Sequence, residues 1–294
     1  MKTTIHPKIE RSDIVLMDDV IYSQPLVYFG RKPRPLKMML LRPIDWWGQT
    51  KLPPLPTILW IVGGAWQQTF PSWRMAEFSY LAYAGFQIAA IDYRTINEAT
   101  FPAQVEDCKT AVRFLRANAK RYGVDVDNIA VMGDSAGGYL AAMLGATGDD
   151  HAFETDEYAG VSSAVKAVVD WYGPIDLWRM RQDAQEKNPN ASEEDEMLFR
   201  LFAGCPIRQE NRKFLERMNP ERSLSAKTPP HLILHGTVDE MVDVRESERY
   251  YEALVKAGVP AELYLLEGAG HCSVEFSQPE VQTIILDFFI RHLK

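Results

Sequence analysis

NIAVMGDSAGG spans residues 128–138 and joins an apolar run to a Gly-x-Ser-x-Gly motif, with a second apolar segment directly after it. A strand, a sharp turn and a helix would place the serine hydroxyl clear of a sheet, where the next backbone N–H reaches a developing oxyanion. Gly133 and Gly137 supply the small residues that such a turn requires. This context predicts that Ser135 is a catalytic nucleophile and that Ala136 N–H is an oxyanion donor.

A serine hydroxyl also needs a general base and a group that orients this base. His271 lies among glycines just after the apolar run 261–266, and Asp239 follows the apolar run 231–234. The carboxyl ends of parallel strands meet at one edge of a sheet, where open α/β folds bind their ligands. The order nucleophile, acid, base along the chain is also that of the α/β-hydrolase architecture. We therefore expect Ser135, Asp239 and His271 to form a catalytic triad.

Other residues near these positions have to be weighed as well. Glu240 and Asp243 are rivals to Asp239, which we favour because it comes first in the loop after its strand. His235 flanks the same strand and is expected to fix the following turn by hydrogen bonding. The imidazole of His271 is expected to be neutral before turnover, with a pKa near the ordinary value of about 6.5.

A second oxyanion donor is expected in residues 59–66, which read LWIVGGAW. The pattern is an apolar strand followed by a glycine pair. Without bulky side chains, the backbone N–H groups of Gly63 and Gly64 can approach a substrate oxygen to hydrogen-bonding distance. The other interpretation is an ordinary Gly-Gly turn.

These motifs together resemble those of the α/β-hydrolase esterase and lipase superfamily. Within it, the chain is most similar to small carboxylesterases related to hormone-sensitive lipase, acetyl xylan esterases and bacterial feruloyl esterases. The resemblance implies a triad of Ser135, His271 and Asp239. The motifs that carry it are VGGAW at 62–66, DYR at 92–94, Glu98, Phe101-Pro102, GDSAGG at 133–138, HGTVD at 235–239 and GAGH at 268–271.

The resemblance also implies an oxyanion hole built from the backbone of Gly63 or Gly64 and of Ala136. One position departs from the family pattern. Val62 stands where the family usually has a histidine, whose side chain often braces the oxyanion loop. The backbone donors remain, but the rigidity of the loop must come from other contacts.

Composition narrows the functional class. The chain has 294 residues, a formal charge of -8 and three cysteines without metal-like spacing. The acidic balance argues against a nucleic acid partner, and no apolar run approaches the roughly 18 residues of a membrane span. The first residues lack the apolar core of a secretory signal, so we predict a cytoplasmic enzyme. We expect a single domain over residues 1–294 and a reaction that needs no metal or organic cofactor. The sequence does not decide between a monomer and a homo-oligomer.

The predicted elements alternate after two early antiparallel strands, so we expect a mostly parallel, twisted sheet with helices on both faces. A helix after Pro102 should cover the sheet, with Lys109 and Arg113 outside its apolar stripe. The predicted strands are 14–22, 36–41, 57–62, 86–91, 165–171, 232–234 and 261–266, and further helices are expected at 73–84 and around 281–289.

Residues 176–225 interrupt this alternation with charged, methionine and aromatic residues. Such a long connection is usually functional, and we predict a helical cap inserted over the active site, with a solvated helix start at 193–196. Candidate substrate contacts are Trp66, Trp178 and Phe199. The aromatic residues around the oxyanion loop fit two interpretations, a platform that stacks on a sugar or phenolic ring and ordinary core packing, and the family resemblance is what supports the first. They are Trp46, Trp47, Trp66, Phe70 and Trp73.

The predicted function is a serine carboxylesterase for small acyl esters, with acetyl or feruloyl esters of sugars as the expected substrates. Two alternatives remain. One is an amide hydrolase with the same triad, similar to arylformamidases or peptidases of this superfamily. The other is a relative that binds a ligand without catalysis.

Overall fold

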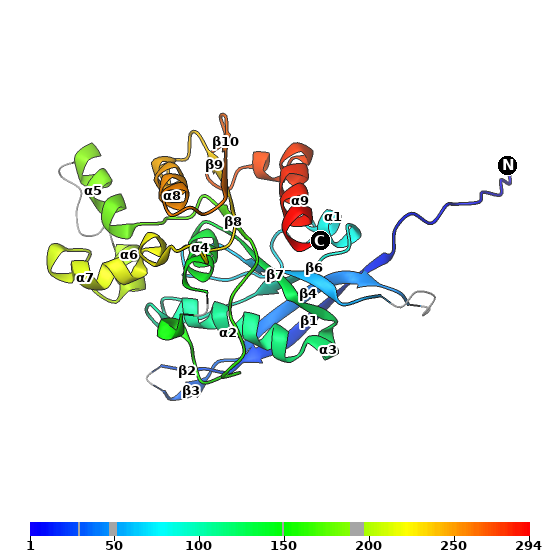
Figure 1. Ribbon diagram of the computed structural model, residues 1–294, viewed down its shortest axis with the longest axis horizontal. Helices are drawn as coiled ribbons and strands as arrows, with labels where there is room; N and C mark the ends of the chain where they lie inside the picture. The colour runs from blue at the N-terminus through cyan, green and yellow to red at the C-terminus, as the bar shows by residue number, and fades with distance from the viewer. Residues whose placement is uncertain (29, 47–51, 149, 189–196) are drawn as a thin grey trace.

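An eight-stranded sheet runs through the molecule (Figure 1). The computed structural model describes residues 1–28, 30–46, 52–148, 150–188 and 197–294. The strand order is β1-β4-β6-β5-β7-β8-β9-β10, in which β4 pairs antiparallel with β1 and β6 and the other pairs are parallel. The strands are β1 (Asp13–Ser23), β4 (Leu36–Ile44), β5 (Leu55–Ile61), β6 (Gln87–Ile91), β7 (Val124–Asp134), β8 (Val168–Trp171), β9 (His231–Gly236) and β10 (Ala261–Leu266). This topology confirms the predicted α/β-hydrolase fold.

Two apolar layers hold the helices against opposite faces of this sheet. In β5, Leu59 and Ile61 belong to the core under α2 and α4, whereas Ile58 and Trp60 belong to the core under α1 and α9. This alternation follows from the two-residue period of a strand. The helices outside the β8–β9 connection are α1 (Ser79–Tyr83), α2 (Ala103–Ala117), α3 (Ala119–Tyr122), α4 (Ala136–Thr147), α8 (Arg245–Lys256) and α9 (Pro279–Leu293).

The helix predicted at 73–84 is shorter in the structure, because α1 begins only at Ser79. Arg74 has a φ of 67°, in the left-handed region that a right-handed helix cannot accommodate. Its guanidinium instead donates from Nη1 to Glu77 and to Ser277, both at 3.0 Å. The left-handed backbone and the side-chain contacts of Arg74 thus coincide with the later start of the helix.

The prediction that Lys109 and Arg113 lie outside the apolar stripe of α2 is wrong. Both side chains are fully covered. Lys109 Nζ donates to the carbonyl oxygens of Gly148 and Asp150, at 2.9 and 2.7 Å, and Arg113 Nη1 donates to the Thr155 carbonyl at 2.8 Å. The connection after α4 folds over α2, and its carbonyl groups compensate the loss of water around the two cations.

We name residues 172–230, between β8 and β9, the β8–β9 segment. Its described residues, 172–188 and 197–230, form three helices and several short 3₁₀ turns. Its helices are α5 (Leu177–Lys187), α6 (Met197–Ala203) and α7 (Arg212–Leu215). Figure 1 shows these helices gathered on the side of the molecule away from α1 and α9. The helix start predicted at 193–196 lies outside the described residues.

Candidate active site

Ser135 sits on the sharp turn between β7 and α4. Its φ of 52° and ψ of -121° are strained for a residue with a side chain, and its N–H donates to the Trp171 carbonyl at 2.8 Å. A Cβ atom on Gly133 would lie 2.2 Å from the Gly137 carbonyl oxygen, and one on Gly137 would lie 1.9 Å from that of Ile61. Only glycine at these two positions lets the helix start so close to the sheet.

The structure brings the three predicted triad side chains together. His271 Nε2 lies 2.9 Å from Ser135 Oγ, and His271 Nδ1 lies 2.6 Å from Asp239 Oδ2. The other carboxylate oxygen of Asp239 accepts the N–H groups of Met241 and Val242, both at 2.9 Å. The three side chains are thus linked by hydrogen bonds in the order that a nucleophile, a general base and an orienting acid require.

The rival acids lie elsewhere. Asp243 accepts hydrogen bonds from Lys187 and Arg245, and Glu240 lines, together with Asp239 and Asp243, a cavity beside α5. Burial alone would raise the pKa of Asp239, but hydrogen bonds from His235, His271 and Val242 N–H hold that pKa well below its usual range. Asp239 is therefore ionised and can stabilise an imidazolium.

The expected pKa of His271 needs a correction. Burial by itself would lower the pKa of this imidazole, but hydrogen bonds and charge interactions with Asp239 and Cys272 outweigh burial and raise it to about 9. The neutral, base-competent form is therefore favoured only on the alkaline side of neutrality. The close carboxylate, which no spacing along the chain reveals, accounts for much of this shift.

The two glycines predicted as oxyanion donors differ in the structure. Gly63 N–H donates to Asp134 Oδ1 at 2.6 Å, so the prediction of Gly63 as a donor to a substrate needs a correction, and Gly64 remains the candidate donor of this loop. In the part of the chain that the structure describes, neither Gly64 N–H nor Ala136 N–H donates to another group. Gly64 has a φ of 123°, and a Cβ atom there would lie 2.5 Å from the Gln68 carbonyl oxygen.

The same loop is braced despite the absence of a histidine at position 62. Tyr93 Oη donates to the Val62 carbonyl at 2.9 Å, and Asp134 holds Gly63 from below. Burial raises the pKa of Asp134, against the opposing effects of Gly63 N–H and Arg74. Two buried polar contacts thus stabilise the loop from its protein side.

Two unequal cavities open beside Ser135. The larger has a volume of about 440 Å³, and the smaller has a volume of about 70 Å³. Polar residues Gln67, Gln68 and Asn97 line the larger cavity together with Trp73. The smaller cavity is mainly apolar and includes Trp66, Ala136, Pro174, Leu198, Phe199 and Val242. The nucleophile therefore faces two chemically different spaces.

Of the three residues predicted to contact the substrate, two line a cavity beside Ser135 and one does not. Trp66 and Phe199 line the small cavity, and the Trp66 ring stacks on Phe202 with 4.0 Å between ring centroids. Trp178 lines neither cavity beside Ser135; its ring packs under the Arg212 guanidinium. Of the proposed aromatic platform, Trp73 borders the large cavity, Trp46 and Phe70 do not, and Trp47 lies outside the described residues.

A third cavity, of about 470 Å³, lies between α5 and the loop after β9. It shares Met180, Phe199 and Met241 with the small cavity. Met241 lines all three spaces. Met241, Gln67, Gln68 and Asn97 line these cavities but were not among the predicted site residues. In the sequence, only their closeness to the motifs at 62–66, 92–94 and 235–239 indicates a place near the site.

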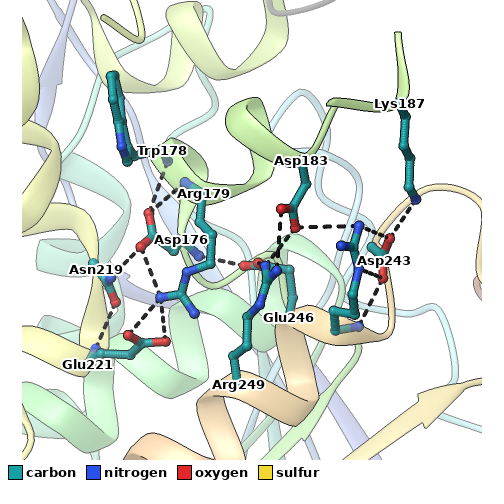
Figure 2. A network of polar contacts seen from close by, with 11 residues as sticks. Asp176, Trp178, Arg179, Asp183, Lys187, Asn219, Glu221, Asp243, Glu246 and Arg249 are labelled. Carbon is teal, nitrogen blue, oxygen red and sulfur yellow. Dashed lines mark hydrogen bonds and ion pairs between the residues drawn. The ribbon is translucent and has the colours of Figure 1, made fainter. Parts of the chain in front are cut away.

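Ion pairs connect α5 to the loop after β9 and to α8 (Figure 2). Lys187 Nζ lies 2.6 Å from Asp243, and Arg249 Nη1 lies 2.6 Å from Asp183. Glu246 accepts the N–H of Asp176 at 2.8 Å, and burial raises the pKa of Glu246 to about 7 against the opposing effect of that bond. Met180 and its helix are thereby held beside the loop that carries Asp239.

Two further properties concern only the described residues. They contain no cluster of three or more histidine, cysteine, aspartate or glutamate side chains that could hold a metal ion. No helix among them has the length and apolar character needed to cross a membrane.

Comparison with known proteins gives consistent matches. The BD-FAE family matches residues 47–254. An esterase named LipC from Mycobacterium tuberculosis is 32% identical over 232 residues, which cover 78% of this chain and 56% of the relative. The chain spans about half the length of the curated relatives it matches.

Solved structures extend the similarity to almost the whole chain. A truncated carbohydrate esterase from gut microbiota has a TM-score of 0.76 at 25% identity, covering 95% of this chain and 96% of that one. Esterase 2 of Thermogutta terrifontis with bound propionate has a TM-score of 0.70 at 27% identity, covering 97% and 94%.

Proposed function

This chain belongs to the BD-FAE family of α/β-hydrolase esterases, and we propose that it is a serine carboxylesterase for short acyl groups, above all acetyl, carried on carbohydrate hydroxyls. The observation that carries this proposal is the pair of unequal cavities at Ser135, one small and apolar, the other large and polar. The similarity to a carbohydrate esterase supports it.

In the first half of the proposed reaction, His271 Nε2 takes the proton of Ser135 Oγ while this oxygen attacks the ester carbonyl. The carbonyl oxygen becomes an oxyanion, which accepts the N–H groups of Gly64 and Ala136. Asp239 keeps the imidazole in the required tautomer and stabilises its positive charge. The imidazolium then donates its proton to the departing alcohol oxygen, which leaves an acyl-Ser135 ester.

In the second half, a water molecule enters the space left by the alcohol. His271 takes one of its protons, and the hydroxide oxygen attacks the acyl carbon. Collapse of the second tetrahedral intermediate returns the proton to Ser135 and releases the carboxylic acid. Every proton in this scheme passes through His271, which must be neutral to act as a base. Because the pKa of His271 is raised to about 9, we expect kcat/KM to rise with pH above the range of an ordinary histidine.

The two cavities distinguish the acyl from the alcohol side. A cavity of about 70 Å³ with apolar walls suits a methyl or ethyl group, and the larger cavity, with Gln67, Gln68, Asn97 and Trp73, suits a hydroxyl-rich ring that both hydrogen-bonds and stacks. A feruloyl group exceeds the small cavity. We therefore favour acetyl over feruloyl esters, with the β8–β9 segment as the cap that limits acyl size.

Acyl chain length provides the direct test. We expect kcat/KM for 4-nitrophenyl esters to fall at least about tenfold between butyrate and octanoate, because methylenes that do not fit lose roughly 1–3 kcal/mol each. The measurement is a panel from acetate to decanoate, with methyl ferulate and acetylated xylo-oligosaccharide included. A flat profile, or faster turnover of methyl ferulate than of the acetylated sugar, would contradict the assignment of the small cavity.

The alcohol side is tested through Asn97. We expect Asn97→Ala to raise KM for acetylated xylo-oligosaccharide roughly three- to tenfold, the equivalent of one hydrogen bond. The effect on 4-nitrophenyl acetate should be smaller, because its leaving group lacks hydroxyls. The control is Gln185→Ala, an exposed amide on α5. Equal effects of Asn97→Ala on both substrates would argue against a sugar in the large cavity.

A further inference from the structure

A second histidine contacts the triad acid from the protein interior. His235 Nε2 lies 3.3 Å from Asp239 Oδ2, the same oxygen that His271 contacts at 2.6 Å. It also lies 2.9 Å from the carbonyl oxygen of Val242. The side chains of His235 and Asp239 are both completely buried. One carboxylate oxygen thus lies between two imidazoles, one facing the nucleophile and one facing the core.

The partners of His235 show that Nε2 carries a proton. The Val242 carbonyl can only accept, so Nε2 must carry a hydrogen. His235 Nδ1 lies 2.7 Å from Ser247 Oγ, and this hydroxyl can donate to a neutral ring. Both nitrogens are then satisfied in the uncharged imidazole, whose Nε2–H is shared between Val242 and Asp239.

The contact with Val242 adds a second connection. The N–H of Val242 donates to Asp239 Oδ1, while its carbonyl accepts from His235. The ring therefore binds both the catalytic carboxylate and the backbone that holds the other carboxylate oxygen. A displacement of His235 would release the acid from two sides.

We propose that His235 is a positioning residue for catalysis: as a hydrogen-bond donor from the core, it fixes the Asp239 carboxylate in the orientation that His271 requires. This inference rests on the proposed esterase function. It gives His235 a role in the reaction beyond the turn-fixing role that its position along the chain indicates.

Other titratable groups surround this pair of imidazoles. Asp170 on β8 interacts electrostatically with His235, and the Tyr172 ring packs against both histidines, with centroids 6.3 Å from His235 and 4.6 Å from His271. Cys272 and Asp134 interact with His271. A substitution at residue 235 leaves these side chains in place, and both His235→Asn and His235→Gln remove the interaction of the imidazole with Asp170 and Tyr172, so that loss is common to the two variants compared below.

Two amides separate the positioning role from a structural one. A glutamine amide reaches about as far from the backbone as Nε2, whereas an asparagine amide ends near Nδ1. In His235→Asn, the contact with Ser247 can persist but the donor to Asp239 is lost. In His235→Gln, a donor toward Asp239 remains.

We expect His235→Asn to lower kcat for 4-nitrophenyl acetate about tenfold or more, with KM within twofold of wild type. The acid limb of kcat/KM should move to higher pH: without this donor, the more basic carboxylate retains the proton on His271 more strongly, and the base must lose that proton to act. His235→Gln should restore kcat to within about threefold and return the acid limb to its wild-type position.

His231 provides a matched control on the same strand. It is also completely buried, and its ring bonds Pro229 and Tyr250, away from the triad. His231→Asn should lower the unfolding temperature in the manner of His235→Asn but leave the pH profile unchanged. The inference is overturned if His235→Asn retains the wild-type kcat and acid limb, or if His235→Gln does no better than His235→Asn.

Folding and function are checked separately. If His235→Asn fails to fold, the pH profile of His235→Gln alone decides, and a shifted acid limb in that variant overturns the inference. Wild-type enzyme that is active and labelled at Ser135 by a fluorophosphonate supports the proposed function whatever happens at residue 235. Failure of that labelling refutes the esterase proposal itself.

Discussion

Ser135→Ala is expected to lower kcat for 4-nitrophenyl acetate by roughly 10⁶-fold, the loss typical of removing a serine nucleophile. In the proposed reaction, the oxygen that lies 2.9 Å from His271 Nε2 is the one that attacks the carbonyl. Alanine has the same Cβ atom and meets the same strained φ of 52°, so the unfolding temperature should change little. Circular dichroism and a thermal melt measure this directly.

A buried serine elsewhere serves as the control. Ser163 Oγ donates to the Gly148 carbonyl at 2.9 Å, outside the candidate active site, and Ser163→Ala should retain turnover even if stability falls. Near-wild-type hydrolysis by Ser135→Ala would refute the assignment of Ser135 as the nucleophile. A parallel assay with an anilide decides between the ester and amide alternatives, because an amine leaving group demands stronger protonation.

Asp239→Asn is expected to lower kcat about 10⁴-fold with the fold intact. The Met241 and Val242 N–H groups already face Oδ1, so the new NH₂ group must turn toward His271 Nδ1. That nitrogen would then have to accept a hydrogen bond, which leaves the proton on Nε2. An imidazole in this tautomer cannot take the proton of Ser135. The measurement is kcat across the pH range of the wild-type enzyme.

Asp243→Asn is the matched control, because Asp243 is the rival acid in the same loop. Its carboxylate pairs with Lys187 and Arg245 rather than with His271. We expect its kcat to fall less than about tenfold, through a weakened tie between α5 and the loop. A larger loss in Asp243→Asn than in Asp239→Asn would reverse the assignment of the acid.

Failures of the sequence analysis have a common physical cause. The sequence-based predictions contain no element at residues 245–256, where the structure has α8. The buried side of α8 includes Glu246 and Ser247 as well as Tyr250 and Leu254, and a pattern of apolar residues does not mark such polar residues as buried. The prediction that Lys109 and Arg113 lie outside the apolar stripe fails for the same reason. The residue pattern of α2 contains no information about the segment after α4 that covers these two side chains.

Local features of the active site were readable from the chain itself. The turn around Ser135 depends on glycines within a few residues of it, and the steric requirement that they meet is short-range. The α/β alternation and the order of nucleophile, acid and base along the chain likewise follow from neighbouring residues. These features indicated the architecture and the three residues that the fold brings together.

Packing between distant segments decided the remainder. Asp134 binds the N–H of Gly63 but not that of Gly64. His235 contacts Asp239 from the core. The cavities differ in size because α5 and α6 place side chains beside Ser135. Each of these contacts depends on how the whole sheet and its covering helices are arranged in space. A one-dimensional pattern records which face of an element is apolar, but the group that meets this face is determined only when the chain is folded.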